Sequence, residues 1–280
     1  MHDPENVSSP PPTAPMPPAA PTAPVEPQIS PDALPGWIVE EDDDFIVLNK
    51  PAGIVCHPSK DGPWSSIIGA VKAWKQQETL HLVSRLDRET SGILLIAKNR
   101  PAARLSQMAM EFRQVSKTYL TLLQGELAAP VLVDEPIARD LASPVAVKRH
   151  VARTADAQTA VTFFEPLHSQ NGYTLVRVTP HTGRTHQIRV HAQWLGFPVV
   201  GDKLYGPDER LYLDFVETGW GVRHTAMLAM SRQALHAARL EFKGEQFQRT
   251  FTAPLAEDMQ TFCREKLGMG SPTNYTNFTN

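Results

Sequence analysis

A short polar segment between two apolar runs carries the residues best suited to chemistry. It reads Ser84-Arg85-Leu86-Asp87-Arg88-Glu89-Thr90-Ser91-Gly92 and lies between residues 81–83 and 93–97. Because Arg85 and Arg88 flank Asp87, its carboxylate should stay ionised and able to act as a nucleophile or a base. The arginines could equally hold phosphate groups. On spacing alone a salt-bridged turn is the simpler interpretation, and the alternatives stay open at this point.

Three histidines at equal intervals raise the question of a metal. His181, His186 and His191 recur every five residues, which suits neither one helical face nor a pair four residues apart. No carboxylate completes a ligand set, and Cys56 and Cys263 belong to no Cys-x-x-Cys pair. We therefore expect no metal, and the cysteine usage indicates a reducing compartment.

Apolar periodicity predicts the elements that position the Asp87 segment. It predicts a β-hairpin from residues 37–39 and 45–48, and further strands at 81–83, 93–97, 118–123, 161–164 and 173–179. Helices are expected from Pro63 to about Trp74 with Asp61 near the cap, from Pro101 to about Arg113, and from about His186 to Leu195, capped by Thr182 or Thr185 and ended by Gly196. This mixture predicts an α+β fold on a largely antiparallel mixed sheet with flanking helices.

The first residues differ in composition from the rest of the chain. Residues 1–35 contain 12 of the 25 prolines, so we expect a disordered proline-rich tail, whose PPTAP and PPAAP stretches could also dock a protein partner. The first 44 residues hold nine acidic residues and no Lys or Arg. The remaining chain therefore has 27 basic against 21 acidic residues, a formal charge of +6. A basic body is compatible with a polyanionic partner without requiring one.

Four ordered motifs resemble the RluA-type family of pseudouridine synthases, which modify ribosomal and transfer RNA. They are Asn49-Lys50-Pro51-Ala52-Gly53 with His57-Pro58, Arg85-Leu86-Asp87-Arg88 with Thr90-Ser91-Gly92, Lys117-Thr118-Tyr119, and Gly183 to His191. Gly201-Asp202 with Tyr205-Gly206, and Leu235-His236-Ala237, extend the resemblance over about residues 37–255. Ser84 departs from the family, which usually has His there. The proline-rich tail also cannot be the small S4-type domain that many relatives carry.

The resemblance implies the roles of individual residues. Asp87 would attack or deprotonate the ribose of a uridine, after which the uracil detaches, turns and rejoins the sugar through C5. Tyr119 would pack on the uracil and is the candidate for taking the C5 proton, while Arg189 would pair with Asp87 through its guanidinium fork. Arg85 would fill the space that an extruded base leaves. The remaining implied RNA contacts are Arg88, Thr90, Lys117, Arg184 and His186.

The expected organisation is a proline-rich tail (1–35), a single pseudouridine synthase catalytic domain with a central RNA-binding cleft (36–262) and a C-terminal tail (263–280). We expect a cytoplasmic enzyme that acts on structured ribosomal or transfer RNA, with no cofactor, membrane or DNA. Three alternatives remain: an RNA-binding module that has lost its chemistry, a metal-dependent hydrolase built on the histidines, and a scaffold organised by the tail.

Overall fold

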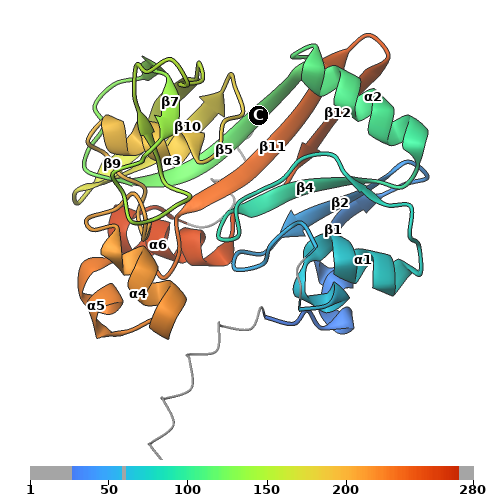
Figure 1. The fold of residues 1–280 in the computed structure, drawn as a ribbon, viewed down its shortest axis with the longest axis horizontal. Coiled ribbons are helices and arrows are strands. Elements are labelled where there is room, and N and C mark those ends of the chain that lie inside the picture. The colour runs from blue at the N-terminus through green and yellow to red at the C-terminus, as the bar shows by residue number, and fades with distance from the viewer. Residues whose placement is uncertain (1–26, 59–60, 271–280) are drawn as a thin grey trace, which may run out of the picture.

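One large, mostly antiparallel sheet runs through the protein. The computed structural model describes residues 27–58 and 61–270, and within these ranges ten strands form a sheet of order β1-β2-β4-β11-β5-β10-β9-β6, with β12 added to β11 and β3 to β4. A separate pair, β7 and β8, makes a small ribbon. Figure 1 shows the sheet crossing the molecule with helices around both ends. The predicted α+β fold is confirmed.

The first part of the chain forms one end of this sheet. Its elements are η1 (Pro31–Trp37), β1 (Ile38–Glu41), β2 (Phe45–Lys50), η2 (Pro63–Ser65), α1 (Ile67–Lys75), β3 (His81–Leu82), β4 (Ser91–Ala97) and α2 (Arg100–Glu111). Alternate side chains of β2 face opposite ways: Ile46 and Leu48 pack with α1, whereas Phe45 and Val47 pack with α2 and β12. This half of the sheet is therefore covered on both faces.

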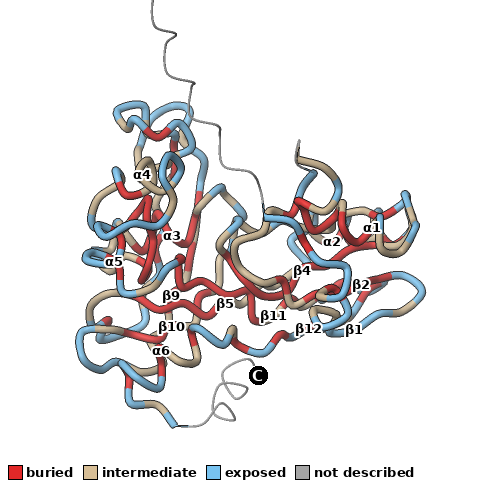
Figure 2. The backbone as a smooth tube through the Cα atoms, turned by 90° about the horizontal axis from the view of Figure 1, so that it is seen from below, coloured by how far each residue is buried: buried red, intermediate tan, exposed pale blue. Residues whose placement is uncertain are grey.

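The remaining elements form the other end. They are β5 (Val115–Gln124), β6 (Val131–Asp134), β7 (Ile137–Arg139), β8 (Arg149–Val151), β9 (Val161–Gln170), β10 (Tyr173–Pro180), α3 (Gln187–Trp194), α4 (Arg210–Thr218), α5 (Val222–Met227), β11 (Leu235–Gly244), β12 (Phe247–Thr252) and α6 (Glu257–Leu267). Figure 2 shows α3 and α6 on opposite sides of β9 and β10, whose buried residues form the largest core cluster with them.

The two ends of the sheet meet where β4 runs parallel to β11. This pairing is short, with His236 opposite Ser91 and Ala237 opposite Gly92. A Cβ atom on Gly92 would lie 2.2 Å from the carbonyl oxygen of Ala237, and the residue has φ +108°. Only glycine allows so close an approach of the two backbones. The predicted active segment ends at this junction, with its last two residues, Ser91 and Gly92, forming the start of β4.

Some predicted helix ends were wrong. Pro63 begins a 3₁₀ turn, and α1 begins only at Ile67, where the Ser66 hydroxyl accepts a hydrogen bond from the Gly69 amide. Ser66, not Asp61, is therefore the cap, because it is the residue that satisfies a first-turn amide. At α3, neither Thr182 nor Thr185 is the cap; His186 precedes the helix in a left-handed conformation.

The folded body also extends beyond both predicted boundaries. Ile29 and Leu34 are buried against α1, and the Ile29 amide donates to the Trp64 carbonyl at 2.7 Å, so residues 29–35 do not belong to a tail. At the other end α6 continues through the buried Cys263 to Leu267. The rest of the predicted tails, residues 1–26 and 271–280, lies outside the described residues. No helix among the residues described is long and apolar enough to span a membrane.

Candidate active site

The loop that carries Asp87 is held by hydrogen bonds to its backbone. The Lys50 ammonium at the end of β2 is fully buried and donates to the carbonyls of Arg88, Ile54 and Pro51 at 2.8–3.0 Å. Burial lowers the pKa of Lys50 to about 8. The Gly53 amide also donates to the Arg88 carbonyl, at 2.9 Å. The turn after β2 thus fixes one side of the loop.

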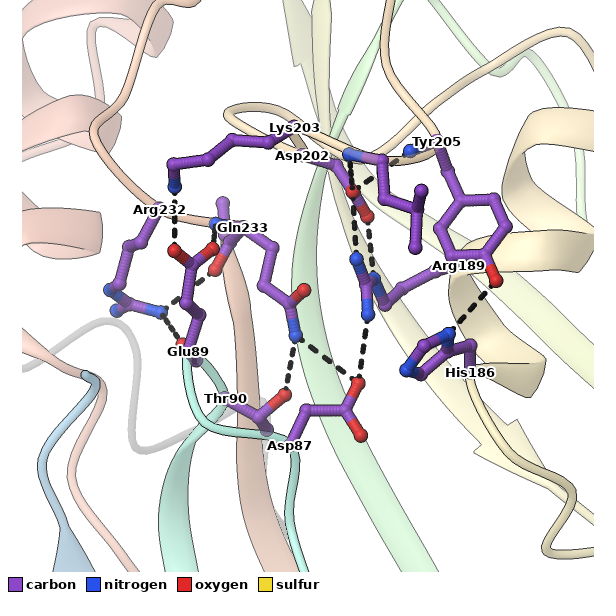
Figure 3. Close-up of polar contacts among 12 residues, drawn as sticks. Asp87, Glu89, Thr90, His186, Arg189, Asp202, Lys203, Tyr205, Arg232 and Gln233 are labelled. Carbon is purple, nitrogen blue, oxygen red and sulfur yellow. Dashed lines mark hydrogen bonds and ion pairs between the residues drawn. The ribbon is translucent and has the colours of Figure 1, made fainter. Parts of the chain in front are cut away.

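Residues from the loop after α3 and from the segment before β11 fix the other side. The Glu89 carboxylate accepts from Lys203 at 2.6 Å and from the Gln233 amide at 3.2 Å, and the Glu89 carbonyl accepts from Arg232. The Gln233 side chain donates to Thr90 Oγ1 at 2.8 Å and, more weakly, to Asp87 Oδ2 at 3.4 Å. Figure 3 shows these contacts converging on the loop from above. Asp87 is therefore presented by a rigid segment.

Arg189 of α3 joins Asp87 to a second carboxylate. Its Nη1 donates to Asp87 Oδ2 at 3.1 Å, whereas its Nε and Nη2 donate to the two oxygens of Asp202 at 2.6 and 2.8 Å. The predicted contact between Arg189 and Asp87 is present, but the guanidinium fork binds Asp202 instead. Asp202 is fully buried and its Oδ1 also accepts the amides of Leu204 and Tyr205, so it is the better anchored acceptor.

The charges around Asp87 keep it ionised. Burial alone would raise the pKa of Asp87, but the Arg189 guanidinium and the hydrogen bonds from Arg189 and Gln233 outweigh burial and hold the pKa below its ordinary range. The Asp87 side chain is 34% exposed, against 8% for Arg189. Both hydrogen bonds to the carboxylate reach Oδ2, so Oδ1 has no partner in residues 27–58 and 61–270. An ionised oxygen is thus available at the surface of the cleft.

His186 has a defined tautomer. The Tyr205 hydroxyl accepts a hydrogen bond from the Arg149 amide at 2.9 Å and lies 2.8 Å from His186 Nδ1. Because Tyr205 is buried, its hydroxyl hydrogen needs an acceptor, and Nδ1 is the acceptor within reach. His186 is then protonated at Nε2, which Figure 3 shows directed to the side on which Asp87 lies. Burial, together with the charge of Arg189, lowers the pKa of His186 to about 4, so the ring is neutral at pH 7.

Tyr119 approaches the same space from β5, where it is paired with Val178 of β10 and Ala237 of β11. Burial and the negative charge of Asp87 raise the pKa of Tyr119 above its ordinary value. Its phenol is therefore neutral. The predicted transfer of the C5 proton to Tyr119 stays a prediction.

Two adjoining cavities collect the predicted residues. Asp87, Tyr119 and Arg189 line a cavity of about 140 Å³, together with the predicted RNA contacts Arg85, Thr90, Lys117, Arg184 and His186. A wider cleft of about 680 Å³ shares Arg85, Asp87, Lys117, Arg184 and His186 with it and adds Arg88. All nine residues predicted from the sequence thus lie around one cleft.

The other histidines have separate roles. His191 is buried and is held by Thr162 Oγ1 at 2.8 Å and by the Glu135 carbonyl at 3.0 Å. His186 binds Tyr205, whereas His181 is exposed. Cys56 and Cys263 are buried and form no disulfide.

Comparison with known proteins identifies the family. The model of the RNA pseudouridylate synthase family matches residues 44–194, which include Asp87, Tyr119 and Arg189. The chain belongs to this family. The predicted RluA-type resemblance is thereby confirmed, and the protein is an RNA pseudouridine synthase, an isomerase that converts uridine within RNA.

Relatives of this pseudouridine synthase extend over most of its length. Ribosomal large subunit pseudouridine synthase D of Vibrio vulnificus is 34% identical over 252 residues, which cover 85% of this chain and 74% of the relative. An uncharacterized RNA pseudouridine synthase of Bacillus subtilis, YjbO, is 37% identical over 229 residues, or 79% of this chain and 73% of the relative. The structure of human RNA pseudouridylate synthase domain containing 4 superimposes with a TM-score of 0.65 at 26% identity, covering 86% of this chain and 97% of that one.

Sequence reasoning missed several residues that build the synthase's active site. Asp202, Tyr205 and Lys50 were noted only as parts of segments that resemble the family. Gln233 and Glu89 were not assigned roles. Their contacts with Arg189, His186 and the Asp87 loop join segments more than a hundred residues apart in several cases, and one chain's sequence carries no signal of such distant pairing.

Proposed function

We propose that Asp87 is the catalytic carboxylate and that its Oδ1 meets the ribose of the target uridine. The observation that carries the proposal is the asymmetry of this carboxylate: Oδ2 is held by Arg189 and Gln233, while Oδ1 is left for the substrate. Reaction with C1′ or removal of the C2′ proton both require the ionised form. In either route the bond from C1′ to N1 breaks and a bond from C1′ to C5 forms, while the C5 proton is released to water and N1 takes up one proton from water.

We assign the surrounding residues to positioning and binding. Arg189 orients Asp87, and the Tyr119 ring supports the uracil while it turns. Arg85, on the exposed rim of the cleft, takes the place of the extruded base in the RNA. Neutral His186 donates through Nε2 to an acceptor of the nucleotide. Arg88, Thr90, Lys117 and Arg184 bind the flanking RNA.

We propose that the substrate is a structured ribosomal or transfer RNA in the cytoplasm. A relative covering most of this chain is named for the large ribosomal subunit, which favours large-subunit ribosomal RNA. The catalytic body itself supplies the recognition surface in this proposal, with the proline-rich tail free to bind a protein partner.

The test is a transcriptome-wide map of pseudouridine in cells with the intact gene, no gene, or the Asp87→Asn gene. We expect the same one or few sites to disappear in the last two strains. Asp156→Asn, a surface change of the same chemistry, is the matched control and should keep every site. Retention of all sites in the Asp87→Asn strain would exclude Asp87 as the catalytic group. No altered site in the deletion strain would favour the binding-module alternative.

A further inference from the structure

A second groove leads away from the Asp87 cavity on the side of β5 and α2. It has a volume of about 580 Å³ and lies between the C-terminal end of α2, the start of β5 and the loop before α3. Figure 1 shows the end of α2 and the start of β5 beside the β11–β12 hairpin. The groove and the wide cleft share Met110, Lys117, Gly183 and Arg184, so the two spaces adjoin.

Basic side chains dominate this second groove. Its charged or titratable lining is Glu111, Arg113, Lys117, His181, Arg184 and Lys243, so one carboxylate stands against four Lys or Arg side chains. Arg113 and Lys243 at the outer end are both exposed. Lys243 also lies 3.1 Å from Glu241, but an exposed pair of this kind is weak and leaves the ammonium accessible. A concave surface of one sign concentrates a polyanion.

Lys117 marks the inner end. It lines the Asp87 cavity, the wide cleft and the second groove, and its ammonium has no hydrogen-bond or ion-pair partner within the described part of the chain. Burial lowers the pKa of Lys117, so the protein itself supplies no counter-charge that would stabilise the ammonium. An anion entering from the groove would complete this site.

Arg113 occupies a backbone position that ordinarily favours glycine. Its φ is +56°, in the left-handed region, directly after α2. A non-glycine residue in this conformation carries a backbone strain energy, which a useful side chain can justify. An arginine at this point places a long cation at the mouth of the groove, opposite Lys243 from the β11–β12 hairpin.

We infer that the RNA strand on one side of the target uridine leaves the active site along this groove, with its phosphates bound by Lys117, Arg113 and Lys243. The inference rests on the proposed function, because it takes the nucleotide at Asp87 as the starting point of the strand. Arg113 and Lys117 are four residues apart, or roughly 13 Å at the rise of a strand, so the bound segment is only a few nucleotides long. Such contacts position the RNA and do not read its sequence.

The experiment measures how RNA binding depends on salt. A fluorescein-labelled hairpin RNA with a uridine-rich loop is titrated at several salt concentrations against the full chain and the Arg113→Gln/Lys243→Gln variant. Each lost phosphate contact lowers the slope of log K against log salt by about 0.7–0.9, so the double variant should lose roughly 1.5. Arg264→Gln/Lys266→Gln, on the exposed side of α6, removes the same charge elsewhere and should keep the wild-type slope.

A second measurement separates this inference from the proposed function. Release of tritium from ribosomal and transfer RNA labelled with [5-³H]uridine reports isomerisation, and the KM of the Arg113→Gln/Lys243→Gln variant should rise several-fold. If that variant keeps the wild-type slope of log K against log salt, the inference about the groove is wrong, even when the native enzyme releases tritium. A reduced slope without tritium release by the native enzyme supports the groove and rejects the proposed function. If the α6 control loses as much slope as the groove variant, the effect comes from net charge alone, and the inference is wrong.

Discussion

Arg189 is shared unequally between two carboxylates. Asp202 takes the guanidinium fork and two backbone amides, while Asp87 takes a single contact and keeps a third of its surface in the cleft. Asp202 therefore fixes the arginine, and the arginine in turn fixes Asp87. This order explains how a reactive carboxylate can be oriented without being enclosed.

Replacing Asp202 by Asn should damage both stability and turnover. The change leaves the charge of Arg189 buried with only Asp87 to balance it, which costs on the order of 3 kcal/mol. Turnover should fall because Arg189 then draws closer to Asp87 and reduces its access to substrate. Urea unfolding and tritium release from labelled RNA measure the two effects.

The exposed ion pair between Asp208 and Arg223 provides the control. Asp208→Asn removes a carboxylate from a pair whose members are 29% and 44% exposed, and should cost at most about 1 kcal/mol with no loss of turnover. If Asp202→Asn and Asp208→Asn lost similar amounts of unfolding free energy and turnover, burial of the Arg189–Asp202 pair would not explain its importance.

At the scale of the elements, apolar periodicity predicted the bounds of regular segments well, but it did not predict the points at which the chain changes direction. The strands around Asp87 and the hairpin of β1 and β2 were predicted close to their observed bounds. The start of α1 was not, because the Pro63 signal belongs to a 3₁₀ turn and the true cap is Ser66. The residues lining the cleft came from motif resemblance, whereas Asp202 and Gln233 act through contacts that only the folded chain creates.

Gly92→Ala should separate β4 from β11. The new methyl group would meet the Ala237 carbonyl at 2.2 Å, and the two strands cannot move apart without breaking the junction. We expect a loss of at least about 3 kcal/mol of unfolding free energy, or no folded protein. Urea unfolding followed by circular dichroism measures it.

Gly172→Ala is the matched variant, since Gly172 also has a positive φ, +76°, but has no atom within 4 Å of the place that the added methyl group would take. Gly172→Ala measures only the cost of a positive φ for alanine, about 1 kcal/mol, without a steric clash of the added methyl group. Equal losses in the two glycine variants would contradict a special role for close approach.

On the scale of the whole molecule, the acidic N-terminal residues are partly structural. Glu41 pairs with Lys75 and Lys98, and Glu40 and Asp42 pair with Arg249. These carboxylates therefore neutralise Lys75, Lys98 and Arg249, none of which lines the second groove. They therefore leave the positive charge of that groove in place, although the net charge of the whole chain gives no sign of it.

The protein should become less stable between pH 6.5 and 4. Burial lowers the pKa of His236 to about 4, and the pKa of His186 is lowered to about 4 as well, so the unfolded chain binds more protons than the native one in this interval. Their effect is absent above the ordinary value of about 6.5 and grows as the pH falls. The carboxylates of Asp87 and Asp202 have lowered pKa values, so their contribution persists through this interval and is lost only in more acidic solution.

Urea midpoints at pH 7 and pH 5 measure this dependence. The midpoint should fall at pH 5, and His236→Gln should reduce the fall because one buried group no longer titrates. His150→Gln, at a side chain that is 43% exposed, should leave the fall unchanged. A midpoint that is equal at the two pH values would contradict burial of neutral imidazoles as the cause.

The brief parallel pairing of β4 with β11 has a mechanical consequence. Asp87 belongs to the segment before β4, whereas Arg189 and Tyr119 belong to the half of the sheet beyond β11. The ion pair between Asp87 and Arg189 therefore joins the two halves of the sheet across this short junction, so a twist of one half against the other would change its length. Bound RNA that twisted the sheet would therefore change the distance between Asp87 and Arg189, and with it the orientation of the carboxylate on which the proposed chemistry depends.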